Sequence, residues 1–217
     1  MQLYIESFNP FHTNCYFLTD EVTGSTVVID PGCYFRRERT RVQRLILLKD
    51  WHIERVVATH LHIDHVFGAS FLKTLCGCPL EAALQDNYWV ELAPQRCKEV
   101  GLELRMPIEP VEHSLQQGDT VRFGEEELSV FQVPGHSPGS LVFYHSGTKS
   151  LFTGDTLFRR GIGRTDLPGG NRQELLENIR RVIFSFPDDT IVYPGHYEAT
   201  TVGDERRNNP FSRGSLN

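Results

Sequence analysis

The segment His60-Leu61-His62-Ile63-Asp64-His65 is the densest group of potential metal ligands in the chain. In an extended segment, residues two apart point the same way, so His60 and His62 can bind one ion. Asp64 and His65 follow directly and can face a second ion. Three of the nine histidines lie within these six residues, beside an aspartate. This spacing of imidazole and carboxylate groups predicts metal binding.

Three later motifs each place one more potential ligand after a short apolar stretch. The ligands are His136 in Pro134-Gly135-His136-Ser137-Pro138-Gly139-Ser140, Asp155 in Gly154-Asp155-Thr156 and His196 in Pro194-Gly195-His196. Each motif alone is a weak signal, because proline and glycine simply mark turns. Loops held by a rigid sheet are common places for binding sites, so we expect all three ligands to join the first segment.

The stretches around these motifs predict the elements that position them. Runs rich in β-branched and aromatic residues predict strands at 2–8, 14–19, 25–30, 55–58, 141–144, 150–153 and 190–193, and a hairpin at 121–133. Helical spacing predicts helices at 37–51, at 65–75, at 83–100 with an interruption at Pro94, and behind a capping box formed by Asn171 and Glu174. This order favours a layered α and β domain with antiparallel or mixed sheets over a doubly wound parallel one.

Composition and charge exclude several classes of protein. The 217 residues are 39% hydrophobic, which suits one compact domain, and the net charge of −6 argues against a nucleic-acid-binding protein. The start of the chain has no signal-peptide pattern, and its longest aliphatic run, 45–48, is too short to span a membrane. Five cysteines do not form a disulfide framework, so we expect reduced thiols and a cytoplasmic protein.

Four histidines lie outside these motifs, at His12, His52, His113 and His145. Their surroundings predict surface or structural roles. The interpretation of His12 stays open, because the loop near Asn14 could approach the metal site.

The ligand pattern resembles that of the metallo-β-lactamase superfamily. Its signature H-x-H-x-D-H is matched by the segment 60–65, and its later histidine, aspartate and histidine by His136, Asp155 and His196. The resemblance implies an α+β fold, a four-layer αββα sandwich, in a single catalytic domain over residues 1–217. It also implies two ligand sets: His60, His62 and His136 for a first ion, and Asp64, His65 and His196 for a second, with Asp155 bridging both.

Within that superfamily the chain is most similar to the glyoxalase II-like hydroxyacylglutathione hydrolases. The similarity rests on Gly154–Phe158, Gly163–Asp166, Pro168–Gly170, Asn14–Tyr16, and the tail Thr200–Gly203 with Asn209-Pro210-Phe211. The two-domain enzymes of this group add a C-terminal helical glutathione-binding domain. This sequence ends at Asn217, so we expect a short, single-domain member without that extension.

The resemblance implies hydrolysis of thioesters of the S-lactoylglutathione type by a metal-bridging hydroxide. Imidazole and carboxylate ligands suit two divalent ions, with zinc expected first and iron or manganese as alternatives. Asp64 and Asp155 are the predicted catalytic carboxylates. Asp30 and Asp166 are candidates to accept hydrogen bonds from ligand histidines. Arg160 and Arg164 are candidates to bind a carboxylate of a small-molecule substrate; the oligomeric state stays open.

The closest alternative is a mononuclear iron persulfide dioxygenase of the same fold. Such an enzyme needs only a facial set like His60 or His62 with His136 and Asp155. A nuclease of the superfamily would carry a basic face, and a β-lactamase would carry a secretory leader, and the sequence has neither. A flavodiiron protein would have glutamate in place of His62. A metal-bound interaction module would need a filled coordination shell.

Overall fold

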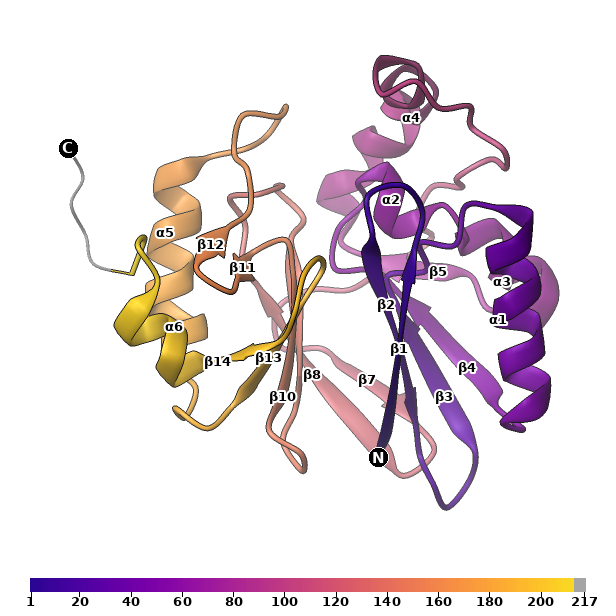
Figure 1. Cartoon of the computed structure of the whole chain (residues 1–217), viewed down its shortest axis with the longest axis horizontal. Coiled ribbons are helices and arrows are strands. Elements are labelled where there is room, and N and C mark those ends of the chain that lie inside the picture. The colour runs from indigo at the N-terminus through magenta and orange to yellow at the C-terminus, as the bar shows by residue number, and fades with distance from the viewer. Residues whose placement is uncertain (213–217) are drawn as a thin grey trace.

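In the computed structural model, which describes residues 1–212, two mixed β-sheets face each other between two layers of helices (Figure 1). The first sheet, in spatial order, contains β1 (Gln2–Phe8), β2 (Thr13–Thr19), β3 (Ser25–Ile29), β4 (His52–Val57), β5 (Leu80–Ala82) and β6 (His113–Ser114). The second contains β14 (Thr200–Thr201), β13 (Ile191–Pro194), β10 (Ser150–Gly154), β9 (Leu141–His145), β8 (Glu126–Gln132) and β7 (Thr120–Phe123). A small hairpin joins β11 (Leu157–Phe158) to β12 (Gly161–Ile162).

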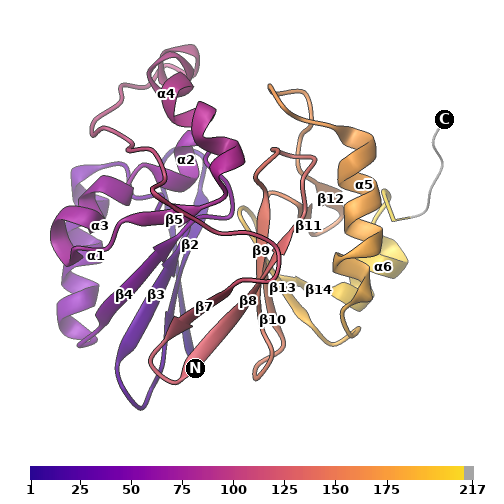
Figure 2. The same cartoon turned by 180° about the vertical axis from the view of Figure 1, so that it is seen from behind.

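The helices divide between the two outer faces. On the side of the first sheet lie α1 (Arg36–Leu48), α2 (Ile63–Val66), α3 (Ala69–Cys76), the 3₁₀ turn η1 (Leu84–Asp86) and α4 (Asn87–Glu99). On the side of the second sheet lie α5 (Arg172–Arg181), the 3₁₀ turn η2 (Ile183–Ser185) and α6 (Val202–Asn208). The view from behind shows the same separation (Figure 2). The predicted αββα sandwich is therefore confirmed. None of the helices within residues 1–212 is long and apolar enough to cross a membrane.

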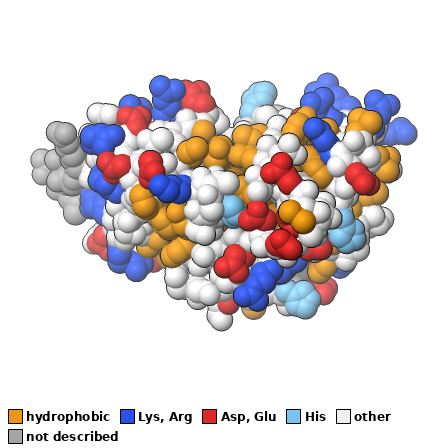
Figure 3. Space-filling view, turned by 90° about the horizontal axis from the view of Figure 1, so that it is seen from below, with side chains coloured by type: hydrophobic (Ala, Val, Ile, Leu, Met, Phe, Trp, Pro, Cys, Tyr) orange, Lys and Arg blue, Asp and Glu red, His pale blue; other side chains and the backbone are white. Residues whose placement is uncertain are grey.

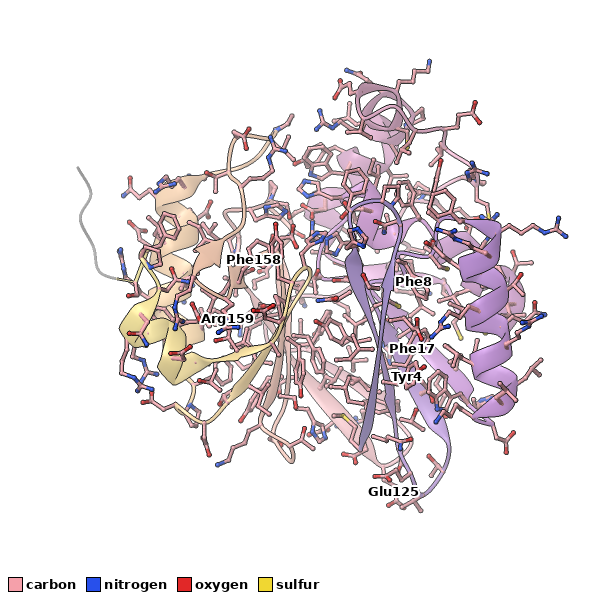
Figure 4. All side chains as sticks on the ribbon, viewed as in Figure 1. Tyr4, Phe8, Phe17, Glu125, Phe158 and Arg159 are labelled. Carbon is pink, nitrogen blue, oxygen red and sulfur yellow. The ribbon has the colours of Figure 1, made fainter. Side chains whose placement is uncertain are left out.

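Alternation along the strands builds the three layers of core. In β2, Tyr16 and Leu18 join the core between the two sheets, whereas Cys15 and Phe17 join the core beneath α1 and α3. This is the period of two that a strand buried on both faces must have. On the outer face of the first sheet, Phe17 stacks on Trp51 with ring centroids 5.0 Å apart. Tyr4, Phe8 and Phe17 lie along β1 and β2 in Figure 4.

Two helix predictions were wrong in detail. The helix predicted at 65–75 is divided at Gly68, where a Cβ atom would lie 2.3 Å from the Cys33 sulfur and 2.8 Å from the Pro31 carbonyl oxygen. The backbone must therefore approach the loop after β3 closely, and this breaks the helix. Conversely, Pro94 lies inside α4 and does not interrupt it. Packing of Trp89, Val90 and Ala93 into the core holds that helix together across the missing hydrogen bond.

The predicted helix start at Asn171 is confirmed, since its side-chain oxygen accepts a hydrogen bond from the Glu174 backbone N–H at 3.1 Å. The predicted mixture of parallel and antiparallel pairs is also confirmed. β3 and β4 run parallel, as do β10 and β13, while β1–β2 and β8–β9 are antiparallel. The face seen from below in Figure 3 carries interspersed acidic and basic side chains with apolar side chains between them.

Candidate metal centre

All seven predicted ligands lie at one edge of the sandwich, the edge where α2 and the β11–β12 hairpin are found (Figure 1). The segment 60–65 follows β4 and continues into α2. His136 follows β8, Asp155 follows β10 and His196 follows β13. Because β10 and β13 are parallel neighbours, their C-terminal ends meet, and this brings Asp155 beside His196.

The first predicted ligand set is a compact group of buried nitrogens. His136 Nε2 lies 3.2 Å from His60 Nε2 and 2.9 Å from His62 Nδ1. Two ligand nitrogens of a tetrahedral zinc ion lie about 3.3 Å apart when each Zn–N bond is about 2.0–2.1 Å. The three side chains are at most 8% exposed. Their spacing therefore fits a small cation held by three imidazoles.

The second predicted set is equally compact but more open. Asp64 Oδ2 lies 3.5 Å from His65 Nε2 and 3.3 Å from His196 Nε2. Asp155 lies between the two sets: Oδ1 is 3.4 Å from His65 Nε2, and Oδ2 is 3.7 Å from His136 Nε2. The Asp64, Asp155 and His196 side chains are each about 15% exposed. One carboxylate thus faces ligands of both sets.

Hydrogen bonds at the outer ring nitrogens of two histidines show which nitrogen of each ring carries the proton. The other nitrogen, which points inward, then has a free lone pair. His136 Nδ1 lies 2.8 Å from the Arg164 carbonyl oxygen, and His196 Nδ1 lies 3.1 Å from the Phe11 carbonyl oxygen. A carbonyl oxygen only accepts, so each Nδ1 must donate, and each neutral ring then presents an unprotonated Nε2. His65 Nε2 and Asp155 Oδ1 are buried without a hydrogen-bond partner. These converging acceptors fit the requirements of a divalent cation.

The two sets differ in their electrostatics. Burial, reinforced by neighbouring histidines, lowers the pKa of His60 and lowers the pKa of His62 to about 3. Burial also acts on His65, but the nearby carboxylates Asp64, Asp30 and Asp155 outweigh it and raise its pKa. Burial therefore favours neutral imidazoles at His60 and His62, whereas three carboxylates surround His65 of the second set.

Asp155 is a carboxylate at neutral pH. Burial alone would raise its pKa, but the charges of His65, His196 and His136 outweigh burial and lower that pKa to about 2. Burial would also raise the pKa of Asp64, but His65, His196 and the Thr13 hydroxyl outweigh burial and lower that pKa. Both groups are therefore in the ionised form that a metal requires.

Of the two carboxylates predicted to support ligand histidines, one does so. Asp30 is fully buried and its Oδ2 lies 2.9 Å from His65 Nδ1. The same oxygen accepts a bond from the Thr59 hydroxyl, which in turn lies 3.1 Å from His60 Nδ1. Asp166 instead forms an exposed bidentate pair with Arg164 and makes no bond to a histidine within residues 1–212. It lies too far out on the loop after β12 to reach a ligand ring.

The two arginines predicted to bind substrate lie in different places. Arg164 lines the cleft above the centre, in line with that prediction. Arg160 does not line it, and its guanidinium pairs with Asp204 and with the buried carboxylate of Glu205. Those α6 carboxylates pair with the Arg160 side chain, and substrate binding by Arg160 stays a prediction.

Two supporting residues were not found from the sequence. Thr13 donates a hydrogen bond from its hydroxyl to Asp64 Oδ2 at 2.8 Å. The sequence held one indication of Thr13, because the loop near Asn14 could approach the metal site. That loop does reach the centre, through Thr13, whereas the His12 side chain is exposed. Asp86 bonds to both loops of the first set, and no sequence pattern singled it out.

Close backbone approach explains one glycine of the ligand motifs. A Cβ atom on Gly195 would lie 2.3 Å from Asp155 Oδ1 and 2.6 Å from the His65 ring. Any other residue would push apart the Asp155 carboxylate and the His65 ring. The Pro194-Gly195-His196 motif thus brings β13 close enough for His196 to join Asp155.

A cleft of about 430 Å³ opens above the two sets. Its floor contains His62, Asp64, His136, Asp155 and His196. Aromatic and aliphatic side chains form most of its walls: Phe11, Ile63, Trp89, Phe158, Leu167 and Tyr197. Phe158, labelled in Figure 4, comes from the β11–β12 hairpin. The arginines of the cleft are Arg96 and Arg164. The centre is therefore accessible to a small molecule with apolar and anionic parts.

Comparison with known proteins agrees with this geometry. A family model for the metallo-beta-lactamase superfamily matches residues 8–196. The hydroxyacylglutathione hydrolase GloC of Haemophilus influenzae is 32% identical over 212 residues, covering 97% of this chain and 98% of that protein. The crystal structure of the BLEG-1 B3 metallo-beta-lactamase superposes with a TM-score of 0.88 at 30% identity, covering 98% of this chain and 100% of the other.

A second solved structure, that of TTHA1623 in a di-iron-bound form, has a TM-score of 0.84 at 33% identity and covers 96% of this chain and 99% of the other. These relatives match the chain along nearly its whole length, and the ligand motifs lie within the matched residues or at their end. With its αββα fold and its clustered histidines and aspartates, the chain belongs to the metallo-β-lactamase superfamily and is similar to its glyoxalase II-like members.

Proposed function

We propose that this protein is a dinuclear metallohydrolase that cleaves thioesters of the hydroxyacylglutathione type. The observation that carries the proposal is the position of Asp155, whose two oxygens face the two ligand sets at the floor of an open cleft. A carboxylate in this position could help to hold two ions, and the cleft beside it would admit a substrate. When bound, two such ions activate water as a nucleophile and polarise a carbonyl oxygen.

The chain's own residues hold and orient this centre. His60, His62 and His136 form the first set, and Asp64, His65 and His196 the second. Asp30 fixes the His65 ring, while the Arg164 and Phe11 carbonyl oxygens fix the His136 and His196 rings. The TTHA1623 neighbour, described as di-iron-bound, supports two ions and leaves zinc, iron and manganese as candidates.

The lining of the cleft favours the proposal of a thioester substrate. Its apolar walls limit access of bulk water to the reacting carbonyl, and the Arg164 guanidinium is available to a substrate carboxylate at the rim. The similarity to the hydroxyacylglutathione hydrolase favours a 2-hydroxyacyl group on a glutathione-like thiol.

The test is a matched substrate screen on protein loaded separately with zinc and with iron. We expect hydrolysis of S-lactoylglutathione with two ions per chain, and loss of that activity in Asp155→Ala. A penicillin is included because one structural neighbour is a B3 metallo-beta-lactamase. Oxygen uptake on glutathione persulfide with one iron per chain, without thioester cleavage, would replace the hydrolase by the dioxygenase.

A further inference from the structure

Asp86 is a buried carboxylate that contacts both loops of the first ligand set. It ends η1, directly before α4, and is fully buried. Its Oδ1 accepts a hydrogen bond from the Gly139 backbone N–H at 2.6 Å. Its Oδ2 accepts one from the Ser137 hydroxyl at 2.6 Å and one from the Leu61 backbone N–H at 3.3 Å. We call these four residues the Asp86 network.

The donors of the network flank the ligands of the first set. Leu61 lies between His60 and His62, and Ser137 directly follows His136. The two loops come from different sheets, since one follows β4 and the other follows β8. One side chain therefore ties together the two segments that must hold three nitrogens about one point.

The local sequence around Gly139 is adapted to this contact. A Cβ atom on Gly139 would lie 2.7 Å from the Asp86 carboxylate carbon and oxygen. A side chain there would push the carboxylate away from the loop of His136. The Ser140 hydroxyl lies 2.8 Å from that of Ser137 and accepts from the Ser137 backbone N–H, which fixes the donor in place.

The hydrogen-bond partners of the Asp86 carboxylate carry no positive charge. Its partners are two backbone amides and one hydroxyl, and no lysine or arginine pairs with it within residues 1–212. An uncompensated buried carboxylate is costly. The first set next to it contains three imidazoles and no ligand carboxylate of its own. A divalent ion bound by that set would help to balance the Asp86 carboxylate.

We propose that Asp86 is a positioning residue for the first metal site: it fixes the His136 loop against the His60–His62 segment and supplies a carboxylate beside a set of three imidazole ligands. The inference rests on the proposed function only for the presence of metal ions, not for the substrate. Asp86 does not line the cleft and so is not expected to touch substrate.

The experiment measures zinc affinity at the first site alone. His196→Ala removes a ligand of the second set, and zinc binding is then followed by competition with a chromophoric chelator. Adding Asp86→Ala to His196→Ala should weaken the remaining zinc site by about 10–100-fold, the usual cost of removing a residue that orients a ligand. Asp86→Asn keeps the shape but not the charge, and should restore part of that affinity. Ser137→Ala should cause a smaller loss.

Asp20 provides a matched control. It is also a buried aspartate that accepts two backbone N–H bonds, from Val22 and Glu125, and one hydroxyl bond, from Thr23. It lies at the opposite end of the sandwich, near the labelled Glu125 in Figure 4. Asp20→Ala should lower the melting temperature without changing zinc affinity.

The outcomes separate the two proposals. If Asp86→Ala and Asp86→Asn both bind zinc as tightly as the His196→Ala parent, the positioning role is wrong. If Asp86→Ala does not fold, Asp86→Asn and Ser137→Ala test the proposal instead. Unchanged zinc affinity in both of these variants would overturn it. Because the readout is zinc binding, a failure to hydrolyse thioesters would contradict the proposed substrate and leave this inference standing.

Discussion

The two ligand sets of the centre are supported by different parts of the molecule. The first consists of buried imidazoles and is tied together by Asp86 from the η1–α4 junction. The second contains Asp64, is partly exposed, and is supported by Asp30 after β3 and Thr13 at the start of β2. Asp155 faces both sets directly. Asp30 reaches His65 directly and His60 through the Thr59 hydroxyl. The comparison teaches that Asp86 and Thr13 are the residues whose replacement should alter one site separately, whereas replacement of Asp155 should affect both.

The charges of the two sets point to a functional division. The enclosed first set favours an ion that stays in place, because its three histidines are buried. The second set brings carboxylates to the open side of the cleft, beside Phe11 and Tyr197. We therefore expect the second ion to exchange with solvent faster than the first.

The largest effect should follow from Asp155→Ala. Removing the shared carboxylate should lower metal content at both sites and reduce kcat/KM by about a thousandfold or more, as for residues that act as one catalytic unit. Metal analysis and steady-state kinetics on the same preparation check this, with circular dichroism as the folding control. A variant that keeps two tightly bound ions and full turnover would contradict the bridging role.

Thr13→Val should affect only the second site. It removes the hydroxyl that donates to Asp64 Oδ2. The affinity for the second ion should fall by about 10–100-fold, while the affinity for the first ion is retained. Chelator competition on the doubly loaded protein measures both steps. Thr26→Val is the matched control, because Thr26 has a buried hydroxyl bonded to Thr19. Equal weakening of both ions in Thr13→Val would refute the separate support of the two sets.

Arg164 and Arg160 should differ in their effects on substrate binding. Within residues 1–212 the Arg164 guanidinium pairs only with the exposed Asp166, a weak interaction that a substrate carboxylate can replace. Arg164→Ala should raise KM for an anionic thioester about tenfold, the cost of one charge-assisted hydrogen bond, with kcat little changed. Arg160→Ala should leave KM unchanged and lower the melting temperature. The opposite pattern in the kinetics would reverse the assignment.

The smallest effect concerns acid stability at the far end of the sandwich. Hydrogen bonds from Glu125, Thr23 and Val22 lower the pKa of Asp20 from 3.8 to about 2. A carboxylate whose pKa is lower in the folded state stabilises the fold at pH values above its pKa in the unfolded chain. That stabilisation is lost as the pH falls through its pKa in the folded state. Asp20→Asn should thus reduce the free energy of unfolding at neutral pH, and the difference from the parent should vanish between pH 3.8 and about 2. A pH-independent difference in urea denaturation would contradict this assignment.

The sequence predicts the ligands better than their supports. Four ligands lie in six consecutive residues, and the other three follow strands, so local patterns suffice to find them. Thr13 contacts Asp64, and Asp86 contacts Ser137, each across 51 residues of chain and only in the folded structure. The same holds for Arg160, whose carboxylate partners come from α6. Pro94 and Gly68 show tertiary packing overriding local helix preference.

The central claim is that two ions bind between these sets and share Asp155. A zinc-soaked crystal, measured at the zinc absorption edge, tests it most directly. The account predicts two anomalous peaks: one among His60, His62 and His136, the other among Asp64, His65 and His196, with an Asp155 oxygen on each. A single peak at full zinc loading, or peaks outside these residues, would contradict it.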